Sequence, residues 1–369
     1  MNRRFILTSL LGLIFLAGMA GCGKSPESGA DFSAAETASG GLRVMTDSTG
    51  RSVEIPEQAE RIVCLNVGAL RYTCYMQAQD LVVGVEDYEK EKSISRGYNY
   101  VNFERFRDLP TVGSNGEHDP EGIIAADPDV IVMSARGSEE ADRLQEQTGI
   151  PVVVVPGSDR MMDEGAYETF RLMGELYGKE ERARELTDYM DSIRNDLEAR
   201  TAGVPDRPTV YVGGVSYKGA HGFEGTEAGY GPFSAIGADN LADQTGQTGP
   251  FSIDPEQVLS WDPDVIFLDY NGLGLINEDY ASNPEYYEQL SAVRKGEVYS
   301  QISFRSSAAN LDTALADTYY AASVLYPEQF ADVDPEEKAG EIFMKLLGKN
   351  FYEDLKAEGY GFQKIVIGK

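Results

Sequence analysis

A thirteen-residue segment that occurs twice in the chain constrains the fold more than any other feature. The stretch 119–131 recurs as 254–266, at an offset of 135 residues, and eight of the thirteen positions are identical. In each copy an Asp-Pro pair is suited to begin a helix, because Asp caps the first amides and Pro fits the first turn. Asp-Pro-Asp then ends the helix, and an unbroken apolar run follows, which is typical of a buried strand in a parallel sheet. The repeat therefore predicts two copies of a helix–strand unit.

Other paired segments extend this repeat. The β-rich runs 61–68 and 209–213 both end in glycine and are followed by helical sequence, and the boundaries 78–84 and 237–242 also correspond. Alternating strands and helices predict βαβ units. About 330 residues follow the N-terminal segment, which is too many for one small core. We therefore predict an α/β fold of two Rossmann-like lobes with a ligand cleft between them.

The longest helical pattern lies between the two predicted lobes. Apolar residues recur at helical spacing up to Gly178, and again at steps of three and four from Ala183 to Leu197. Residues 180–199 would form a rod of about 30 Å at 1.5 Å per residue, which we expect to join the lobes and to limit hinge motion. In chain order, the predicted parts are a signal peptide 1–21, a flexible tether 22–41, an N-terminal α/β lobe 42–160, a helical connector 161–203 and a C-terminal α/β lobe 204–369.

The N-terminus has the pattern of a secretory signal. Two arginines precede an apolar run from Phe5 to Ala17, which is shorter than the roughly twenty residues that span a bilayer. Small residues then stand directly before Cys22, an arrangement that resembles a bacterial lipobox, in which this cysteine is acylated and everything before it is removed. The alternative is an ordinary cleavable signal with a chance cysteine. Residues 23–41 are small and polar, so we expect a tether and an exported protein that a lipid on Cys22 anchors to the outer face of the cytoplasmic membrane.

The chain is strongly acidic, with 61 Asp and Glu against 32 Lys and Arg. Removing residues 1–21 removes two arginines and no acidic residue, so the formal charge of the remaining chain is near −31. Such a surface argues against nucleic acid and anionic lipid as partners, although a few arginines in a cleft can still bind an anion. Besides Cys22 only Cys64 and Cys74 are present. A predicted strand and the helix packed on it lie about 10 Å apart, beyond the roughly 7 Å limit for a disulfide, so we expect two buried thiols.

Motifs spread along the chain occur in an order typical of one family. They are the entry segment 46–63, Leu-Pro-Thr-Val-Gly at 109–113, the repeated Pro-Asp-Val-Ile, the segment 148–153 and Gly-Ala-Asp-Asn at 237–240. Together they resemble the metal-chelate substrate-binding proteins of ABC importers, the class III periplasmic binding proteins, over about residues 42–362. The resemblance implies two Rossmann-like lobes joined by one long helix. It also implies a ligand such as a ferric siderophore, haem, cobalamin, molybdate or tungstate.

The same resemblance implies an ABC importer permease as a partner. In the family, one glutamate of each lobe forms a salt bridge with arginines of the permease, and Glu121 and Glu256 stand at the corresponding places. The alternative is local helix chemistry, because a carboxylate in the first turn interacts favourably with the helix dipole, by roughly 0.3–1 kcal/mol. Both can hold together, since a first-turn position also presents the carboxylate outward.

Candidate ligand-binding residues follow the predicted strands, because ligands of open α/β sheets bind beyond the carboxyl ends of the strands. These candidates are Arg71, Tyr72, Arg136, Tyr217, Lys218, His221, Tyr270 and Arg305. Arginine offers paired hydrogen bonds to carboxylate, catecholate or oxoanion oxygens, and tyrosine adds flat apolar area and a hydroxyl group. Tyr217, His221 and Arg305 rank highest; the first two stand in glycine-rich loops, where the backbone can approach a ligand closely.

A site for a bare metal ion is a weaker alternative. His118 and His221 are the only histidines and stand about a hundred residues apart, whereas a divalent-metal site needs three or four converging ligands. We therefore expect no direct metal ligands, and we interpret His118 as a solvated loop residue beside a helix N-cap.

An exported hydrolase is the alternative from another class of protein. It needs an activated nucleophile on a tight turn, and the chain contains no Gly-x-Ser-x-Gly and no cysteine placed as a reactive thiol. A surface adhesion lipoprotein would explain the anchor but not the repeat. We therefore predict a monomeric, non-enzymatic binding lipoprotein without a cofactor, which captures a metal chelate, first of all a ferric siderophore, and delivers it to a permease. Molybdate or tungstate is the main alternative ligand.

Overall fold

The structure is a computed structural model that describes residues 41–114, 116–157, 161–306 and 308–369. These residues belong to one compact unit, Gly40–Lys369. The predicted signal peptide, Cys22 and all but the last residue of the predicted tether lie outside the described residues, and they stay predictions. Within the described part of the chain, no helix has the length and apolar character needed to cross a membrane.

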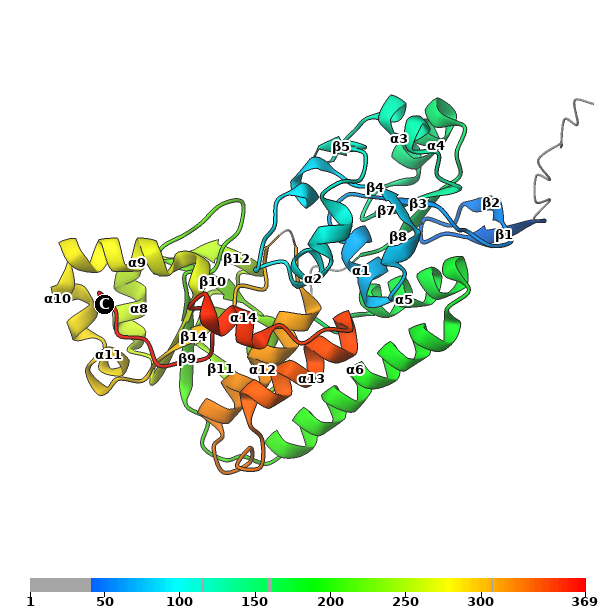
Figure 1. Ribbon diagram of the computed structural model, residues 1–369. Coiled ribbons are helices and arrows are strands. Elements are labelled where there is room, and N and C mark those ends of the chain that lie inside the picture. The colour runs from blue at the N-terminus through cyan, green and yellow to red at the C-terminus, as the bar shows by residue number, and fades with distance from the viewer. Residues whose placement is uncertain (1–40, 115, 158–160, 307) are drawn as a thin grey trace, which may run out of the picture. The chain divides into compact units, whose positions relative to one another are not determined.

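Two four-stranded parallel sheets organise the described residues (Figure 1). The first sheet has the strand order β4 (Val82–Gly84), β3 (Ile62–Leu65), β7 (Val130–Ser134) and β8 (Val152–Val155). The second has the order β11 (Asp239–Asn240), β9 (Thr209–Gly213), β13 (Val265–Asp269) and β14 (Val298–Gln301). We call the parts built around these sheets the N-terminal and C-terminal lobes. The two strand orders correspond, which confirms the predicted pair of similar α/β lobes.

Short antiparallel pairs and helices complete the two lobes. The pairs are β1 (Leu42–Thr46) with β2 (Ser52–Pro56), β5 (Gly113–Ser114) with β6 (Glu117–His118), and β10 (Gly225–Ala228) with β12 (Gly249–Ser252). The N-terminal lobe contains α1 (Ala69–Tyr75), α2 (Gly97–Phe106), α3 (Pro120–Ala126) and α4 (Ser138–Thr148). The later helices are α7 (Gly231–Ser234), α8 (Pro255–Trp261), α9 (Tyr270–Ser282), α10 (Pro284–Gln289), α11 (Ser291–Lys295), α12 (Leu311–Leu325), α13 (Pro335–Leu347) and α14 (Tyr352–Ala357).

Side chains of the strands alternate between the two faces of each sheet, as the period of two requires. In β7, Ile131 and Met133 join a small apolar cluster that includes residues of α3 and α4. Val130 and Val132 point to the other face and join a large cluster, which also contains Phe267 of β13. The inner faces of both sheets therefore contribute to one apolar core, and separating the lobes would expose it to water.

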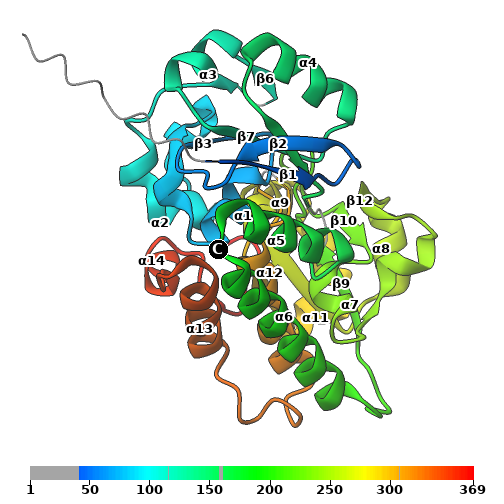
Figure 2. The ribbon, with the colours of Figure 1, turned by 90° about the vertical axis from the view of Figure 1, so that its right-hand side faces the viewer.

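The chain crosses between the sheets through two helices, α5 (Glu164–Tyr177) and α6 (Glu180–Thr201). Gly178 ends α5 in the left-handed conformation, as a helix C-cap often requires. The long helix predicted over 180–199 is α6, which is continuous over 22 residues and runs past both lobes in Figures 1 and 2. The predicted domain boundaries at 160 and 203 flank this crossing and stay predictions.

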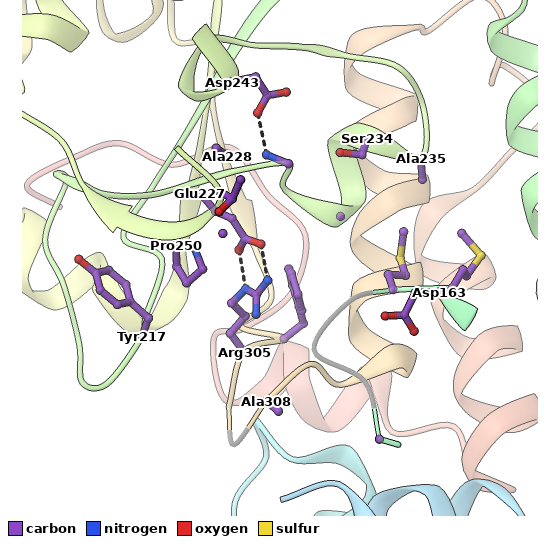
Figure 3. A pocket seen from close by; sticks show the side chains of 18 of the residues that line it. Asp163, Tyr217, Glu227, Ala228, Ser234, Ala235, Asp243, Pro250, Arg305 and Ala308 are labelled. Atoms are coloured by element: carbon purple, nitrogen blue, oxygen red, sulfur yellow. Dashed lines mark hydrogen bonds and ion pairs between the residues drawn. The ribbon is translucent and has the colours of Figure 1, made fainter. Parts of the chain in front are cut away.

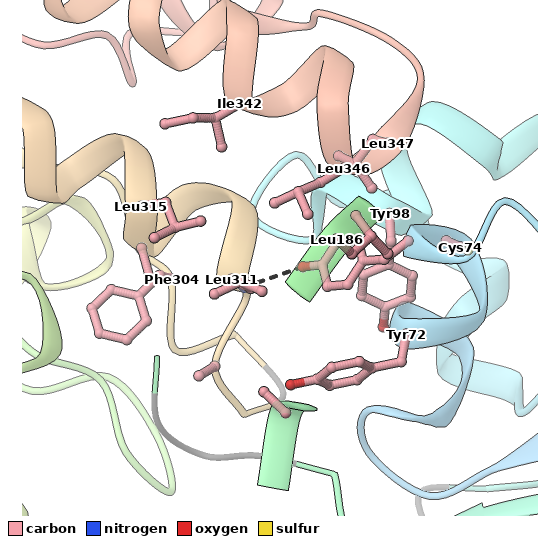
Figure 4. Close-up of a cluster of buried hydrophobic side chains, with 14 of the residues drawn as sticks. Tyr72, Cys74, Tyr98, Leu186, Phe304, Leu311, Leu315, Ile342, Leu346 and Leu347 are labelled. Carbon is pink, nitrogen blue, oxygen red and sulfur yellow. Dashed lines mark hydrogen bonds between the residues drawn. The ribbon is translucent and has the colours of Figure 1, made fainter. Parts of the chain in front are cut away.

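Noncovalent contacts join the lobes at a second place, between α1 and the beginning of α12. Arg71 of α1 donates from Nη1 to the carbonyl oxygen of Ala309 at 2.8 Å. The Tyr75 hydroxyl donates to Oδ1 of Asp312 at 2.6 Å and accepts the backbone N–H of Leu311 at 3.1 Å. Apolar side chains surround this junction, and Figure 4 shows Leu311 among them. Since the junction is buried, we expect it to stiffen the pair of lobes beyond what the connecting helices provide.

The two cysteines of the described residues are buried and not bridged, as predicted. Cys64 lies in β3 and Cys74 in α1, and Sγ of Cys64 contacts Oγ1 of Thr73 at 3.3 Å. Burial raises the pKa of the Cys64 thiol to about 12. Such a thiol stays protonated at neutral pH and is a poor nucleophile.

The repeated Asp-Pro-Asp has the same structural role in both lobes. Asp127 and Asp262 end α3 and α8 with φ angles of 52° and 47°. Oδ2 of Asp129 accepts two backbone N–H groups directly before β3, each at 2.9 Å. Oδ2 of Asp264 accepts the backbone N–H of Thr209, the first residue of β9, at 3.0 Å. Each second aspartate therefore ties the repeated strand to the beginning of its neighbour.

Candidate ligand-binding cleft

A cavity of about 1630 Å³ lies between the carboxyl ends of the two parallel sheets, and we call it the cleft. Its lining includes residues that directly follow β3, β7 and β8 in the N-terminal lobe, and residues that begin three positions after β9 and β14 in the C-terminal lobe. Figure 3 shows Tyr217, Glu227 and Arg305 on one side of the cleft and Asp163 on the other. The cleft therefore occupies the position at which open α/β sheets bind ligands.

Four of the eight predicted ligand residues line the cleft. Arg136 follows β7, Tyr217 and Lys218 follow β9, and Arg305 follows β14. Each stands on a loop within a few residues of a strand end, so its side chain leaves the sheet at the edge that faces the other lobe. Their contact with a ligand stays a prediction.

Arg71 and Tyr72, by contrast, do not line the cleft. Both stand on α1, a full turn beyond the end of β3, and both are almost completely buried. Arg71 lies 5.2 Å from the ring centre of Tyr98, and Tyr72 packs on Phe170 with ring centres 5.1 Å apart. The prediction placed them at the cleft because it did not account for how soon the helix begins after the strand.

Tyr270 and His221 also lie outside the residues that line the cleft. Tyr270 is the first residue of α9, and its hydroxyl donates to the carbonyl oxygen of Gly361 in the C-terminal segment. His221 stacks on Tyr217, with ring centres 4.0 Å apart and planes 4° from parallel. His221 can therefore orient Tyr217 at the cleft without itself lining it.

A polar cluster forms the N-terminal side of the cleft around Asn66, which directly follows β3. Oδ1 of Asn66 lies 3.2 Å from Nε2 of His118 and accepts from Nη2 of Arg136 at 3.3 Å. The Glu140 carboxylate contacts the same two side chains, at 3.9 Å from Nδ1 of His118 and 3.6 Å from Nε of Arg136. Burial lowers the pKa of His118, so its ring is neutral at pH 7. The cluster therefore holds Arg136 at the cleft, and Glu140 balances part of the positive charge of Arg136.

The interpretation of His118 as a solvated loop residue is wrong. It belongs to β6 and pairs with β5, and its side chain is only 10% exposed. Within the described part of the chain, no three His, Cys, Asp or Glu side chains are grouped so that they could hold a metal ion.

An ion pair forms part of the C-terminal side of the cleft. Nε and Nη2 of Arg305 donate to the two carboxylate oxygens of Glu227, which stands on β10 (Figure 3). The ring of Phe304 lies 5.4 Å from the guanidinium carbon. The Glu227 side chain is 3% exposed and the Arg305 side chain 14%. The arginine that ranked high in the sequence is therefore present at the cleft, but with a carboxylate already bound to it.

Two further carboxylates are buried behind this pair. Asp269, at the end of β13, accepts the Ser303 hydroxyl and the backbone N–H of Asn271, the latter at 2.9 Å. Asp317 of α12 accepts the backbone N–H of Ile302 at 2.9 Å. Burial raises the pKa of Asp269 to about 7, and burial raises the pKa of Asp317 well above its ordinary range. At neutral pH the Asp269 carboxyl is thus divided between its protonated and its ionised form.

The raised pKa of Asp269 predicts a pH-dependent stability. The folded state holds the proton up to about pH 7, whereas an unfolded aspartate loses it near pH 4, so stability falls as the pH rises through this window. Asp269→Asn keeps the acceptor oxygen and has no such dependence. We expect the free energy of unfolding of the wild type to fall by roughly 2–3 kcal/mol relative to this variant between pH 5 and pH 8. Urea unfolding at both pH values measures this difference, and a pH-independent difference would contradict the prediction.

The cleft differs in charge from the rest of the chain. Among the described residues, five basic side chains line it, namely Arg136, Arg194, Arg207, Lys218 and Arg305. Four acidic side chains of the same described residues line it, namely Asp163, Glu198, Glu227 and Asp243. Acidic residues outnumber basic ones nearly two to one in the whole sequence, so the described cleft is the less acidic environment. An anion that enters it avoids much of the repulsion that the remaining surface exerts.

Among the lining residues that the sequence did not predict, Asn66 and Glu227 make polar contacts with predicted ones. Asn66 follows β3 by one residue, so the rule that selected the other candidates could also have found it. Glu227 had no such signal, because it stands on the short antiparallel pair of β10 and β12 and not at the end of a parallel strand.

Two α/β lobes of the same strand order with a cleft at their carboxyl ends define a solute-binding protein. The chain matches the periplasmic binding protein family over residues 62–301 and belongs to it. The proteins of this family are substrate-binding components of ABC importers and are not enzymes.

Named relatives cover most of the chain at low identity. The molybdate-binding protein MolA of Haemophilus influenzae is 23% identical over 334 residues, which are 85% of this chain and 93% of MolA. The Fe(3+)-citrate-binding protein YfmC of Bacillus subtilis is 22% identical over 296 residues, which are 79% of this chain and 88% of YfmC. A crystal structure of a periplasmic solute binding protein from Veillonella parvula has a TM-score of 0.67 and 19% identity, and covers 84% of this chain and 94% of that one. At this identity the structural likeness shows the fold.

Proposed function

We propose that this protein captures an anionic metal chelate, first of all a ferric siderophore, in the cleft and delivers it to the permease of an ABC importer. The observation that carries the proposal is the cleft itself, in which basic side chains from both lobes line a cavity of about 1630 Å³ within a strongly acidic protein. Pockets for drug-sized ligands are about 300–1,000 Å³. The cleft therefore has room for a bulky chelate, and arginine and tyrosine suit its carboxylate or catecholate oxygens.

Molybdate or tungstate is the second candidate ligand. It is supported by the relation to MolA, which extends over nearly the whole length of both chains. A tetrahedral oxoanion has four oxygens and would touch only a small part of so large a cleft. It therefore needs a closer approach of the two walls than a siderophore does.

Calorimetric titration of the mature chain tests the proposal. The probes are ferric complexes of a catecholate, a hydroxamate and a citrate ligand, together with haem, cobalamin and molybdate. We expect one-to-one binding of at least one ferric complex with a Kd of about 1 μM or tighter. Binding of molybdate alone would establish the second candidate, and binding of no metal complex at all would overturn the proposed function.

Permease docking through Glu121 and Glu256 belongs to the same proposal. The two glutamates occupy equivalent first-turn positions of α3 and α8, one in each lobe, and both are exposed. No ion pair within the described residues involves either side chain. These positions support docking because two exposed carboxylates on different lobes can engage two sites of a permease at once.

The lipid anchor is proposed from the sequence alone. Cys22→Ser removes the thioether-forming side chain, so we expect the protein to move from the membrane fraction to the soluble exported fraction. Cell fractionation with immunoblotting measures this change. Cys74→Ser is the control, because it removes a buried cysteine and leaves Cys22 in place. Labelled fatty acid that is still incorporated into Cys22→Ser would exclude lipidation of Cys22.

A further inference from the structure

The ion pair between Arg305 and Glu227 raises a question of charge, because Arg305 is the proposed receptor for an anion. Both of the donating nitrogens described above already serve the Glu227 carboxylate, and that carboxylate is almost completely buried. Paired hydrogen bonds between a guanidinium and a carboxylate are among the strongest polar contacts of proteins. An anionic ligand that takes the paired Nε and Nη2 donors of Arg305 must therefore compete with Glu227 for them.

Three carboxylates are buried in this wall of the cleft, and two of them, Glu227 and Asp269, interact with the Arg305 guanidinium. Glu227 comes from β10, Asp269 from the end of β13 and Asp317 from α12. Arg305 and Glu227 both act electrostatically on Asp269, and Asp269 acts in turn on Asp317. Among the described residues, two tyrosine hydroxyls also face this set, namely those of Tyr230, which donates to Gln301 at 3.2 Å, and of Tyr270. Tyrosine hydroxyls stay neutral near pH 7, and burial keeps these two so.

We propose that Arg305 is exchanged between Glu227 and the ligand, and that the buried pair of Glu227 and Asp269 takes up about one proton from solvent as the anion binds. This inference rests on the proposed function, because it requires an anionic ligand. It adds to that function a competing internal carboxylate and a dependence of affinity on pH.

The proton follows from the charge balance of the wall. In the ligand-free cleft, the guanidinium compensates the Glu227 carboxylate. When an anion takes over the guanidinium, it adds negative charge beside two carboxylates and covers them from water. A buried carboxylate that has lost its cation binds a proton more readily. Asp269 is already divided between its two forms near neutral pH.

Titration of the wild-type mature chain is the first test. The probes are molybdate, which remains a dianion between pH 6.5 and pH 8, and a ferric tris-catecholate. Calorimetry in two buffers of different ionisation enthalpy counts the protons that accompany binding. We expect an uptake of about one proton per ligand bound. Since the complex then holds one proton more than the free protein and the free ligand together, the affinity should fall about tenfold for each unit of rising pH.

Glu227→Gln is the second test, and the sign of its effect is decisive. Glutamine keeps an acceptor oxygen near Arg305 but no longer carries the competing charge. We expect affinity for the same probe at pH 8 to rise about tenfold, and the pH dependence to become at least twofold shallower. A carboxylate that only holds Arg305 in place predicts the opposite, namely weaker binding at every pH.

Asp243→Asn is the matched control for general electrostatics. Asp243 also lines the cleft, and its carboxylate accepts the backbone N–H of Gly229 at 2.7 Å and is not paired with Arg305 in the described structure. This variant removes one negative charge from the same cavity and should leave the proton uptake unchanged. Circular dichroism and thermal unfolding of both variants show that each is folded before its affinity is compared.

The possible outcomes separate the exchange from the function. Binding of a probe without proton uptake, or weaker binding by Glu227→Gln, would overturn the exchange and leave the protein a receptor for that probe. Binding of neither probe by the wild type would overturn the exchange, whereas the full set of metal complexes titrated above decides the proposed function. Proton uptake that Glu227→Gln reduces and Asp243→Asn retains would establish the exchange.

Discussion

Cells that carry Glu121→Arg together with Glu256→Arg should lose uptake of the ligand, whereas the purified double variant should bind the ligand as tightly as the wild type. The two positions lie on α3 and α8, which begin the helix–strand unit of each lobe, and they are exposed and remote from the cleft lining. Placing an arginine against arginines of a permease brings like charges together, which costs several kcal/mol at an interface. Reversing a first-turn charge costs the fold only about 0.3–1 kcal/mol at each helix. Transport and stability are therefore affected very differently.

The structure offers a matched control for this experiment. Glu139 and Glu285 are also exposed first-turn glutamates, on α4 of the N-terminal lobe and on α10 of the C-terminal lobe. Glu139→Arg with Glu285→Arg makes the same change of net charge at the same kind of helix position, but outside the repeat. Uptake of radiolabelled ligand should persist in this control. Equal loss in both double variants would indicate a general charge effect, and reduced ligand affinity in the first would contradict docking as the role of Glu121 and Glu256.

The repeat made the fold predictable because its residue types determine where each helix begins and ends. Asp-Pro begins each helix, and the first aspartate of Asp-Pro-Asp ends it in a left-handed conformation. The second aspartate binds the backbone at the start of the neighbouring strand, so it constrains two strands at once. An unbroken apolar run such as 130–133 needs protein on both faces of its sheet, which is typical of a parallel sheet. Local chemistry and fold agree here, and the prediction was correct.

Four of the eight candidate residues line the cleft, and the other four do not because of the direction of their side chains. The rule that ligands bind beyond strand ends locates a piece of backbone, but the residue that faces the cleft depends on where the next helix begins. Arg136 and Lys218 stand on loops and line the cleft, whereas Arg71 lies within α1 and Tyr270 opens α9, so both point into the protein interior. Glu227 could not be found in this way, since its short strand has no apolar period and pairs antiparallel.

Arg71→Met should lower the free energy of unfolding by roughly 3–5 kcal/mol, which is the largest stability effect that we expect from a single polar side chain here. The Arg71 guanidinium is fully buried and donates to the carbonyl oxygens of Ala309 and Ser306, at 2.8 and 3.4 Å. Its charge also acts on the buried Asp312 carboxylate, to which the Tyr75 hydroxyl donates. Methionine fills similar space but satisfies neither carbonyl and removes the positive charge that acts on Asp312. Denaturant unfolding at pH 7 measures the loss.

The same substitution should weaken ligand binding although Arg71 does not line the cleft. Ser306 directly follows Arg305, so the arginine in α1 holds the segment that carries the proposed ligand residue. We expect affinity to fall roughly tenfold, which corresponds to about 1.4 kcal/mol. Arg105→Met is the control, because Arg105 also donates to two backbone carbonyls, those of Gln79 and Asp80, but is 40% exposed. The control should lose less than about 1 kcal/mol of stability and keep its affinity. Unchanged affinity in a folded Arg71→Met would show that the junction of α1 with α12 supports the fold but does not position the cleft.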